Sequence, residues 1–190
     1  MKKVVLSISA MLFGAVCLAQ NTSLVTQTGP NFSAVNQVGT ANNSTVLQGP
    51  SPSSFPNVSN VTQSGLGNLS NVDQQGTGFL TGGNVAAVLQ VGNVNSSTVF
   101  QRGTLQIGTS VQAGNFNTSV INQPAGVGNL ALHNQSGNLN IAVSNQTGLL
   151  NRSITFQSGN GNWAITNQGN LGNLSTVIQA GGAWSLVNQF

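Results

Sequence analysis

The sequence predicts an all-β protein: a two-sheet β-solenoid whose coils of about 22 residues each supply two strands. Three observations support this. A seven-residue unit, Asn-x5-Gln, recurs about every 11 residues along nearly the whole chain. Within each unit, restricted and variable positions alternate with a period of two, which favours strands over helices. Charged residues make up only 3% of the chain, against roughly 25% in average domains.

The repeat can be followed through fifteen units from residue 21 to residue 189. The units are 21–27, 31–37, 42–48, 57–63, 68–74, 84–90, 95–101, 106–112, 117–123, 129–135, 140–146, 151–157, 162–168, 173–179 and 183–189. Only Gln106 and Ala183 replace Asn at the first position. Eleven of the glutamines have Gly two residues later, which suits a tight turn with positive φ. We therefore expect each unit to form one strand followed by one turn.

Positions 1, 3, 5 and 7 of a unit share one face of the strand. Position 3 is Ser, Ala or, at Gly108, Gly, and position 5 is often β-branched, as in Val61 and Ile121. Positions 2, 4 and 6 vary freely. Because stacking restricts the interior most, the uniform face is expected to point inward, and its small third residue lets two such faces approach closely.

Buried Asn and Gln are costly unless their amides are hydrogen-bonded. With strands about 4.8 Å apart, each amide can donate to the identical residue in the next layer, which forms a ladder. Like charges at that spacing would repel by about 3.5 kcal/mol at an effective dielectric of 20, which explains the scarcity of charge. The candidate ladder and self-assembly residues are Asn21, Gln27, Asn31, Gln37, Asn129, Gln135, Asn140, Gln146, Asn151, Gln157, Asn162, Gln168, Asn173, Gln179 and Gln189.

The irregular spacings indicate two strands per coil. Two long insertions, residues 49–56 and 75–83, follow the third and fifth units, and a one-residue expansion at 124–128 follows the ninth. All three follow odd-numbered units, so they are expected at one edge of the stack. Fifteen strands then give seven and a half layers, or roughly 36 Å along the axis.

The N-terminus is typical of a signal peptide over residues 1–19, which leaves residues 20–190 as a single repeat domain. A retained transmembrane anchor is the alternative, but the apolar run is short and interrupted by Ser. Cys17, the only cysteine, would leave with the leader, so disulfides and cysteine metal sites are not expected. The chain is therefore expected to be exported.

Few side chains are available for chemistry. Beyond the leader the charged residues are Asp73, Arg102 and Arg152, which lie off the inward face and form no basic patch, so nucleic-acid binding is not expected. With one acid and one His, we expect no enzyme activity, cofactor, metal or small-molecule substrate. His133 falls at an inward fifth position, where a packed neutral imidazole is favoured over a metal ligand.

The outer face of the odd-numbered units becomes apolar toward the C-terminus, where position 2 includes Trp163 and Trp184. Such a face often marks an interaction site, and lateral contact between fibrils or with a nucleating partner is one interpretation. The other is the general preference of strands for aromatic residues.

The units resemble the curlin repeat of curli fibre subunits, S-x5-Q-x-G-x2-N-x-A-x3-Q. The segment 129–146, NLALHNQSGNLNIAVSNQ, matches with Asn129 in place of Ser, and 151–168 matches in the same way. The likeness covers nearly all of residues 21–190. It implies a secreted functional amyloid with a β-solenoid core that forms cell-surface fibres for biofilm matrix and adhesion. It also implies self-association, a nucleator subunit and outer-membrane secretion machinery as partners.

Two departures accompany the resemblance. Asn replaces the family's Ser at the repeat start, and the repeats begin at the expected cleavage site without a separate export segment. The competing interpretation is a soluble, monomeric β-solenoid at the surface, of adhesin or ice-binding type. Ice binding favours regular Thr arrays, whereas the outer positions here are mixed.

Overall fold

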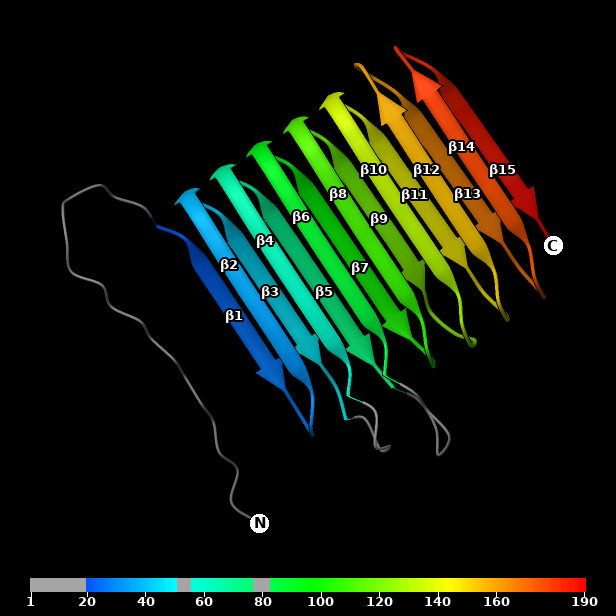
Figure 1. The fold of residues 1–190 in the computed structure, drawn as a ribbon, viewed down its shortest axis with the longest axis horizontal. Coiled ribbons are helices and arrows are strands. Elements are labelled where there is room, and N and C mark those ends of the chain that lie inside the picture. Colours follow the sequence, from blue (N-terminus) through cyan, green and yellow to red (C-terminus); the bar gives the residue numbers. More distant parts are fainter. Residues whose placement is uncertain (1–19, 51–55, 77–82) are drawn as a thin grey trace.

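A computed structural model describes residues 20–50, 56–76 and 83–190 as a stack of fifteen β-strands, with no helix in those ranges (Figure 1). The strands are β1 (Thr22–Gln27), β2 (Phe32–Thr40), β3 (Asn43–Gln48), β4 (Val58–Leu66), β5 (Leu69–Gln75), β6 (Val85–Asn93), β7 (Ser96–Arg102), β8 (Ile107–Asn115), β9 (Thr118–Gln123), β10 (Leu130–Asn138), β11 (Ile141–Gln146), β12 (Arg152–Ser158), β13 (Trp163–Gln168), β14 (Leu174–Ala180) and β15 (Trp184–Gln189). Each of the fifteen expected units contributes one strand. The predicted all-β class is confirmed.

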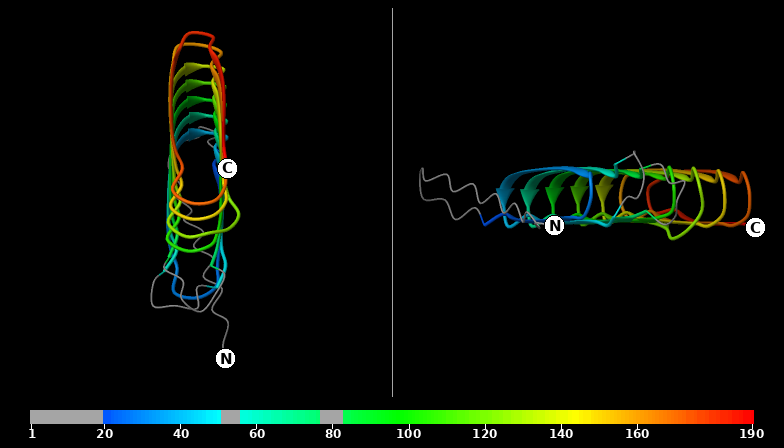
Figure 2. Two further views of the ribbon diagram at one scale, coloured as in Figure 1. Left: turned by 90° about the vertical axis from the view of Figure 1, so that its right-hand side faces the viewer. Right: turned by 90° about the horizontal axis from the view of Figure 1, so that it is seen from below.

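Successive strands belong to opposite sheets. The eight odd-numbered strands form one parallel sheet in the order β1 to β15, and the seven even-numbered strands form the other. We call these the odd sheet and the even sheet. Seen along the stack, the coils form a flattened tube, and the strands of the two sheets run in opposite directions (Figures 1 and 2). The two-strand coil predicted from the insertions is confirmed.

The strands pair in phase with the repeat. Gln27 pairs with Gln48 at the start of the odd sheet, and Gln135 pairs with Gln157 in the even sheet. Every layer therefore places its first, third, fifth and seventh unit positions above those of the layer below. A shift by one residue would turn this face outward, which fixes the register.

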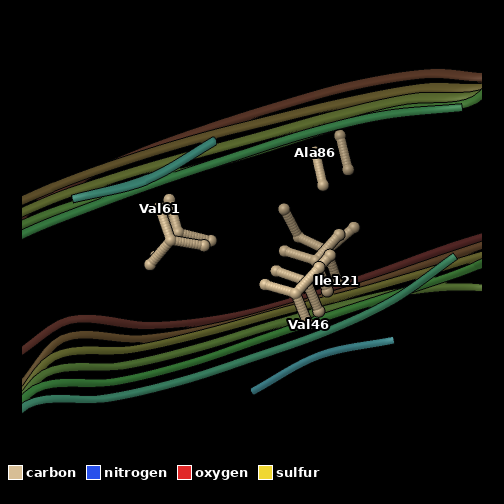
Figure 3. Close-up of a cluster of buried hydrophobic side chains, with 8 residues drawn as sticks. Val46, Val61, Ala86 and Ile121 are labelled. Carbon is tan, nitrogen blue, oxygen red and sulfur yellow. The ribbon is translucent and has the colours of Figure 1, made fainter. Parts of the chain in front are cut away.

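The core is a thin double column of small and β-branched side chains. Val46 and Ile121 project from the odd sheet toward Val61 and Ala86 of the even sheet (Figure 3), and Val72 of β5 belongs to the same cluster. These residues are fully or almost fully buried, and burial of a Val side chain contributes about 1.5–3 kcal/mol. Third positions hold Ser or Ala, and at Gly108 even a Cβ would lie 2.8 Å from Val99 Cγ1. The predicted inward face is confirmed.

The insertions join one edge of the stack, since all odd-numbered strands run in the same direction and end there (Figure 1). Parts of the two long insertions, residues 51–55 and 77–82, lie outside the described residues. So does the expected leader, residues 1–19 with Cys17.

The turns differ from the expected single Gly bend. After β2, β4, β6, β8 and β10 the paired strand continues through the glycine, which has positive φ and packs against its counterpart in the next layer. A Cβ on Gly39 would lie 2.1 Å from the Gly65 carbonyl oxygen. A second positive φ precedes the next unit; it is carried by Gly in some turns, such as Gly67, and by other residues in others, including Val94, Phe116 and Leu139.

Candidate self-assembly site

Two continuous glutamine ladders run through the interior, one along each sheet. In every layer Nε2 donates to Oε1 of the next Gln toward the C-terminus, at 2.6–2.9 Å. The odd ladder joins Gln27, Gln48, Gln74, Gln101, Gln123, Gln146, Gln168 and Gln189. The even ladder joins Gln37, Gln63, Gln90, Gln112, Gln135, Gln157 and Gln179. All the glutamines predicted from the sequence are rungs of these ladders.

The second amide hydrogen of the ladder glutamines bonds to a backbone carbonyl of the opposite sheet. Gln146 of the odd sheet donates to the Leu130 carbonyl of the even sheet at 2.9 Å, and Gln157 of the even sheet donates to the Ile141 carbonyl at 2.8 Å. Each rung thus bonds along the stack and across it. Burial of these amides costs little free energy, because both hydrogens and the oxygen have hydrogen-bond partners.

The asparagines at the first position form two different ladders. In the odd sheet, Oδ1 of Asn140 accepts from both the backbone N–H (3.0 Å) and the side-chain amide (2.9 Å) of Asn162. In the even sheet, Oδ1 of Asn129 accepts only the backbone N–H of Asn151, whose amide turns to the Thr147 and Asn170 carbonyls. The expected side-chain ladder therefore holds for the odd sheet except between Asn117 and Asn140, which share only the backbone N–H bond, and it is absent from the even sheet.

The remaining predicted asparagines follow the same division. Asn21 accepts from Asn42 as the odd-sheet residues do. Asn31 and Asn173 behave as even-sheet residues: Asn31 accepts the Asn57 backbone N–H, and Asn173 donates its own backbone N–H to Asn151 Oδ1. The short Asn side chain lies beside the turn, where backbone carbonyls compete for its amide.

The two departures from Asn both interrupt a ladder. Gln106 donates its backbone N–H to Asn84 Oδ1 at 3.0 Å, but its own Oε1 is buried without a hydrogen-bond partner, so the even ladder is interrupted between Gln106 and Asn129. Ala183 likewise donates to Asn162 Oδ1 at 3.1 Å, but it has no side-chain acceptor to offer a further layer. The odd Asn ladder therefore ends at Ala183.

Sequence reasoning missed two further ladders on the surface. Asn122, Asn145, Asn167 and Asn188 are linked amide to amide at 2.8–3.2 Å on the outer face of the odd sheet. Where even-numbered strands end, Asn93, Asn115 and Asn138, the last residues of β6, β8 and β10, and Asn160, just after β12, are linked by backbone and side-chain bonds. The available signal was an Asn at the sixth position, or three residues after Gln, in successive coils.

His133 lies in the core within a chain of hydroxyls. Its Nδ1 is 2.8 Å from Ser119 Oγ, its Nε2 is 2.7 Å from Ser144 Oγ, and Ser144 contacts Ser153 Oγ at 2.8 Å. Burial lowers the pKa of His133 from 6.5 to about 3, so the imidazole is neutral at physiological pH. Within the described residues no group of three His, Cys, Asp or Glu side chains could hold a metal ion.

The few charged side chains lie off the inward face, as predicted. Arg102 and Asp73 approach to 3.7 Å on the outer face of the odd sheet, and the Arg102 guanidinium lies 4.4 Å from the centre of the Phe100 ring. Such exposed pairs contribute little to stability. Arg152 is exposed on the even sheet.

Trp163 and Trp184 are paired residues of β13 and β15, with 46% and 64% of their surfaces exposed. They lie on the outer face of the odd sheet, next to Ile165 and Leu186 of the same strands. The two residues singled out from the sequence are therefore brought together on one surface.

The interior columns open to solvent at the N-terminal end of the stack. Val25 is 42% exposed, whereas Val46 directly beside it in β3 is 0% exposed. All six residues of β1 are exposed, and the inward residues of β15 at the other end are partly exposed. Among the described residues, the two ends are thus sheet edges with unpaired backbone groups, a typical template for further strands.

Comparisons with protein-family models, with curated proteins and with solved structures gave no match. None of the described segments forms a helix with the length and apolar character needed to span a membrane.

Proposed function

We propose that the chain is a secreted functional-amyloid subunit that polymerises end to end into curli-like extracellular fibres, which serve biofilm matrix, adhesion and surface attachment. The single observation that carries this proposal is the pair of open sheet edges, at which the amide ladders and the apolar core column reach the surface together. A second copy that stacks on such an edge continues both.

The energetics favour addition at the ends. Interior residues such as Val46 and Gln48 are fully buried, whereas their counterparts Val25 and Gln27 in the edge strand are not. Stacking of another strand would bury the apolar surface and complete the backbone pairing of the edge. The resemblance of the repeats to curlin repeats supports the same function.

A charge placed at the open end tests the proposal. We expect the purified protein to form thioflavin-positive fibres with a reflection at about 4.7–4.8 Å along the fibre axis. Val25→Lys places an ammonium in the column that stacking would bury, which is costly without a partner. This variant should keep the β-sheet circular dichroism of the monomer and lose fibre growth.

Thr45→Lys is the matched control, because it adds the same charge to the outer face of β3 within the stack. It should assemble like the parent chain. A parent chain that stays monomeric would contradict the proposal and support a soluble surface β-solenoid instead. Normal fibre growth by Val25→Lys would rule out β1 as an assembling edge.

A further inference from the structure

The path of the chain indicates where the first strand of a second copy would be placed. Every strand inside a sheet pairs with the strand two units before it and the strand two units after it. In the described chain, β14 ends the even sheet and β15 ends the odd sheet, while β1 and β2 begin them. The coil that follows β15 would therefore place its next strand on β14.

We propose that a second copy docks with its β1 on β14 and its β2 on β15, so that adjacent subunits of the fibre are related by a half-turn about the stack axis. This inference rests on the proposed end-to-end polymerisation. A half-turn exchanges the two sheets and reverses the strand direction, and the odd and even strands indeed run in opposite directions (Figure 1). The second copy's odd sheet thus continues the first copy's even sheet in parallel.

The inward ladders pass through this junction. In-register pairing places Gln27 of the second copy on Gln179 and its Gln37 on Gln189, as the rungs Gln157 and Gln168 precede them. Interior rungs donate to one or two backbone carbonyls and to the next Gln, as Gln48 does to two carbonyls and Gln74. At the C-terminal end, Gln179 Nε2 donates to the Trp163 and Ala183 carbonyls at 3.0 Å. Gln189 Nε2 donates to the Leu174 carbonyl at 3.0 Å. Its other hydrogen is positioned for Gln37 Oε1 of the second copy.

The Asn ladder continues in the same register. Asn173 closes the even series, in which each Oδ1 accepts the backbone N–H of the next first-position residue. The half-turn brings the Asn21 backbone N–H of the second copy to Asn173 Oδ1. Without rotation, Asn21 would instead face Ala183, which has no acceptor in its side chain.

The outer faces also match. The surface ladder Asn122–Asn145–Asn167–Asn188 would continue onto Asn36 of the second copy, which occupies the same sixth position in β2. The column of Trp163 and Trp184, which are paired residues of neighbouring strands, would continue onto Phe32. Both Trp184 and Phe32 are more than half exposed in the single chain, at 64% and 59%.

The unrotated arrangement makes poorer contacts. With β1 of the second copy on β15, Trp184 pairs with Thr22 and Asn188 pairs with Thr26. Only the Gln189–Gln27 rung continues a ladder. The even sheet is then interrupted, because β14 and the second copy's β2 are separated by one missing strand, an extra gap of about 4.8 Å. In the half-turn arrangement, both sheets continue into the second copy without a missing strand.

Engineered disulfides distinguish the two junctions. Adjacent residues of parallel strands lie about 4.8 Å apart, within the range of Cα separations that a disulfide spans. In a Cys17→Ser background, Thr26→Cys with Ile178→Cys places the thiols on paired strands only across the half-turn junction. Thr26→Cys with Asn188→Cys places them on paired strands only across the unrotated junction. All three positions are exposed in the single chain.

Each double variant is assembled under reducing conditions, oxidised and run on a non-reducing gel. We expect Thr26→Cys with Ile178→Cys to give a ladder of covalent oligomers, and Thr26→Cys with Asn188→Cys to stay at least tenfold less cross-linked. Asn36→Cys with Asn188→Cys should cross-link as well, since it reports the other sheet of the same junction.

The opposite pattern, or fibres in which none of the three pairs cross-links, would overturn the half-turn junction while leaving end-to-end polymerisation in place. Absence of fibres from the Cys17→Ser chain and its parent would instead remove the proposed function, and this inference with it.

Discussion

At the scale of single residues, the buried amides explain how a polar interior can be stable. Gln146 has one hydrogen on Gln168 Oε1 and the other on the Leu130 carbonyl, and its own Oε1 accepts from Gln123. A Glu at this position would lose the donor and bring a charge into a column of neutral rungs. Position 7 therefore requires Gln, and not merely a polar residue.

His133 is the one inward residue that can gain a charge, which predicts a pH-dependent stability. Its pKa is about 3 in the folded chain, against 6.5 when it is unburied. Between these values the unfolded chain binds the proton and the folded chain does not, so stability falls on acidification. The slope approaches about 1.4 kcal/mol per pH unit. Denaturant unfolding of the unassembled protein at several pH values between 7.5 and 5 measures this slope.

The matched variant is His133→Thr, since Thr155 occupies the same position in the neighbouring layer. It should keep the fold and flatten the pH dependence over that range. Equal slopes in the two proteins would show that His133 is not the group that titrates.

At the scale of strands and turns, the strands could be predicted from the sequence and much of the turn geometry could not. The alternation within each unit reports burial directly, because one face of every strand is interior. The conformation before each unit is set by stacking instead. Leu139 adopts a φ of 59°, which costs roughly 1 kcal/mol for a residue other than Gly, and its N–H bonds to the Asn115 carbonyl at 3.0 Å.

The bonding within the asparagine ladders also could not be predicted from the sequence. The recurrence of Asn identifies the first position as a rung, but Asn162 donates its amide to Asn140 Oδ1 and the Ser158 carbonyl, whereas Asn151 donates its amide to two backbone carbonyls. The choice depends on which turn carbonyls lie within reach, and these are determined by the shapes of the two kinds of turn. A period read from the sequence carries no information on that difference.

The outer faces of β13 and β15 lead to a prediction about lateral association. We expect Trp163→Ser to reduce fibre bundling while elongation continues, because Trp163 lies within the stack and 46% of its surface is exposed. Trp163→Ser with Trp184→Ser should reduce it further. Negative-stain images of fibre width and seeded growth curves measure the two processes separately.

Phe156→Ser is the control on the outer face of the even sheet, at 39% exposure. Its fibres should bundle like those of the parent chain. Unchanged bundling and seeding in the double Trp variant would leave the two tryptophans as ordinary strand residues.

At the scale of the whole molecule, strand number would set the relation between neighbouring subunits of the proposed fibre. Each strand advances the path by half a coil, so fifteen strands place the next copy a half-turn around the axis and roughly 36 Å along it. The fifteenth strand, which lacks a partner in its own coil, is then completed by β2 of the next copy. An even number of strands would remove the rotation.

Deletion of one unit changes the number of strands from odd to even. Removal of residues 140–150 joins Leu139 to Asn151, and the four-residue turn 136–139 then precedes the next unit as it does in the parent chain. Thr155 would take the place of Ser144, whose hydroxyl faces His133. Fourteen strands make seven layers, so we expect fibres with a rise of about 34 Å and no half-turn between subunits.

Removal of residues 140–161 is the matched control, because it deletes a whole coil and keeps an odd number of strands. Its fibres should keep the half-turn, with a rise of about 31 Å. Helical symmetry from electron cryo-microscopy of the three fibres separates the outcomes. A half-turn that persists in the fourteen-strand chain would show that strand number does not determine the junction. If only the fourteen-strand chain loses the half-turn, the number of Asn-x5-Gln units determines the symmetry of the fibre.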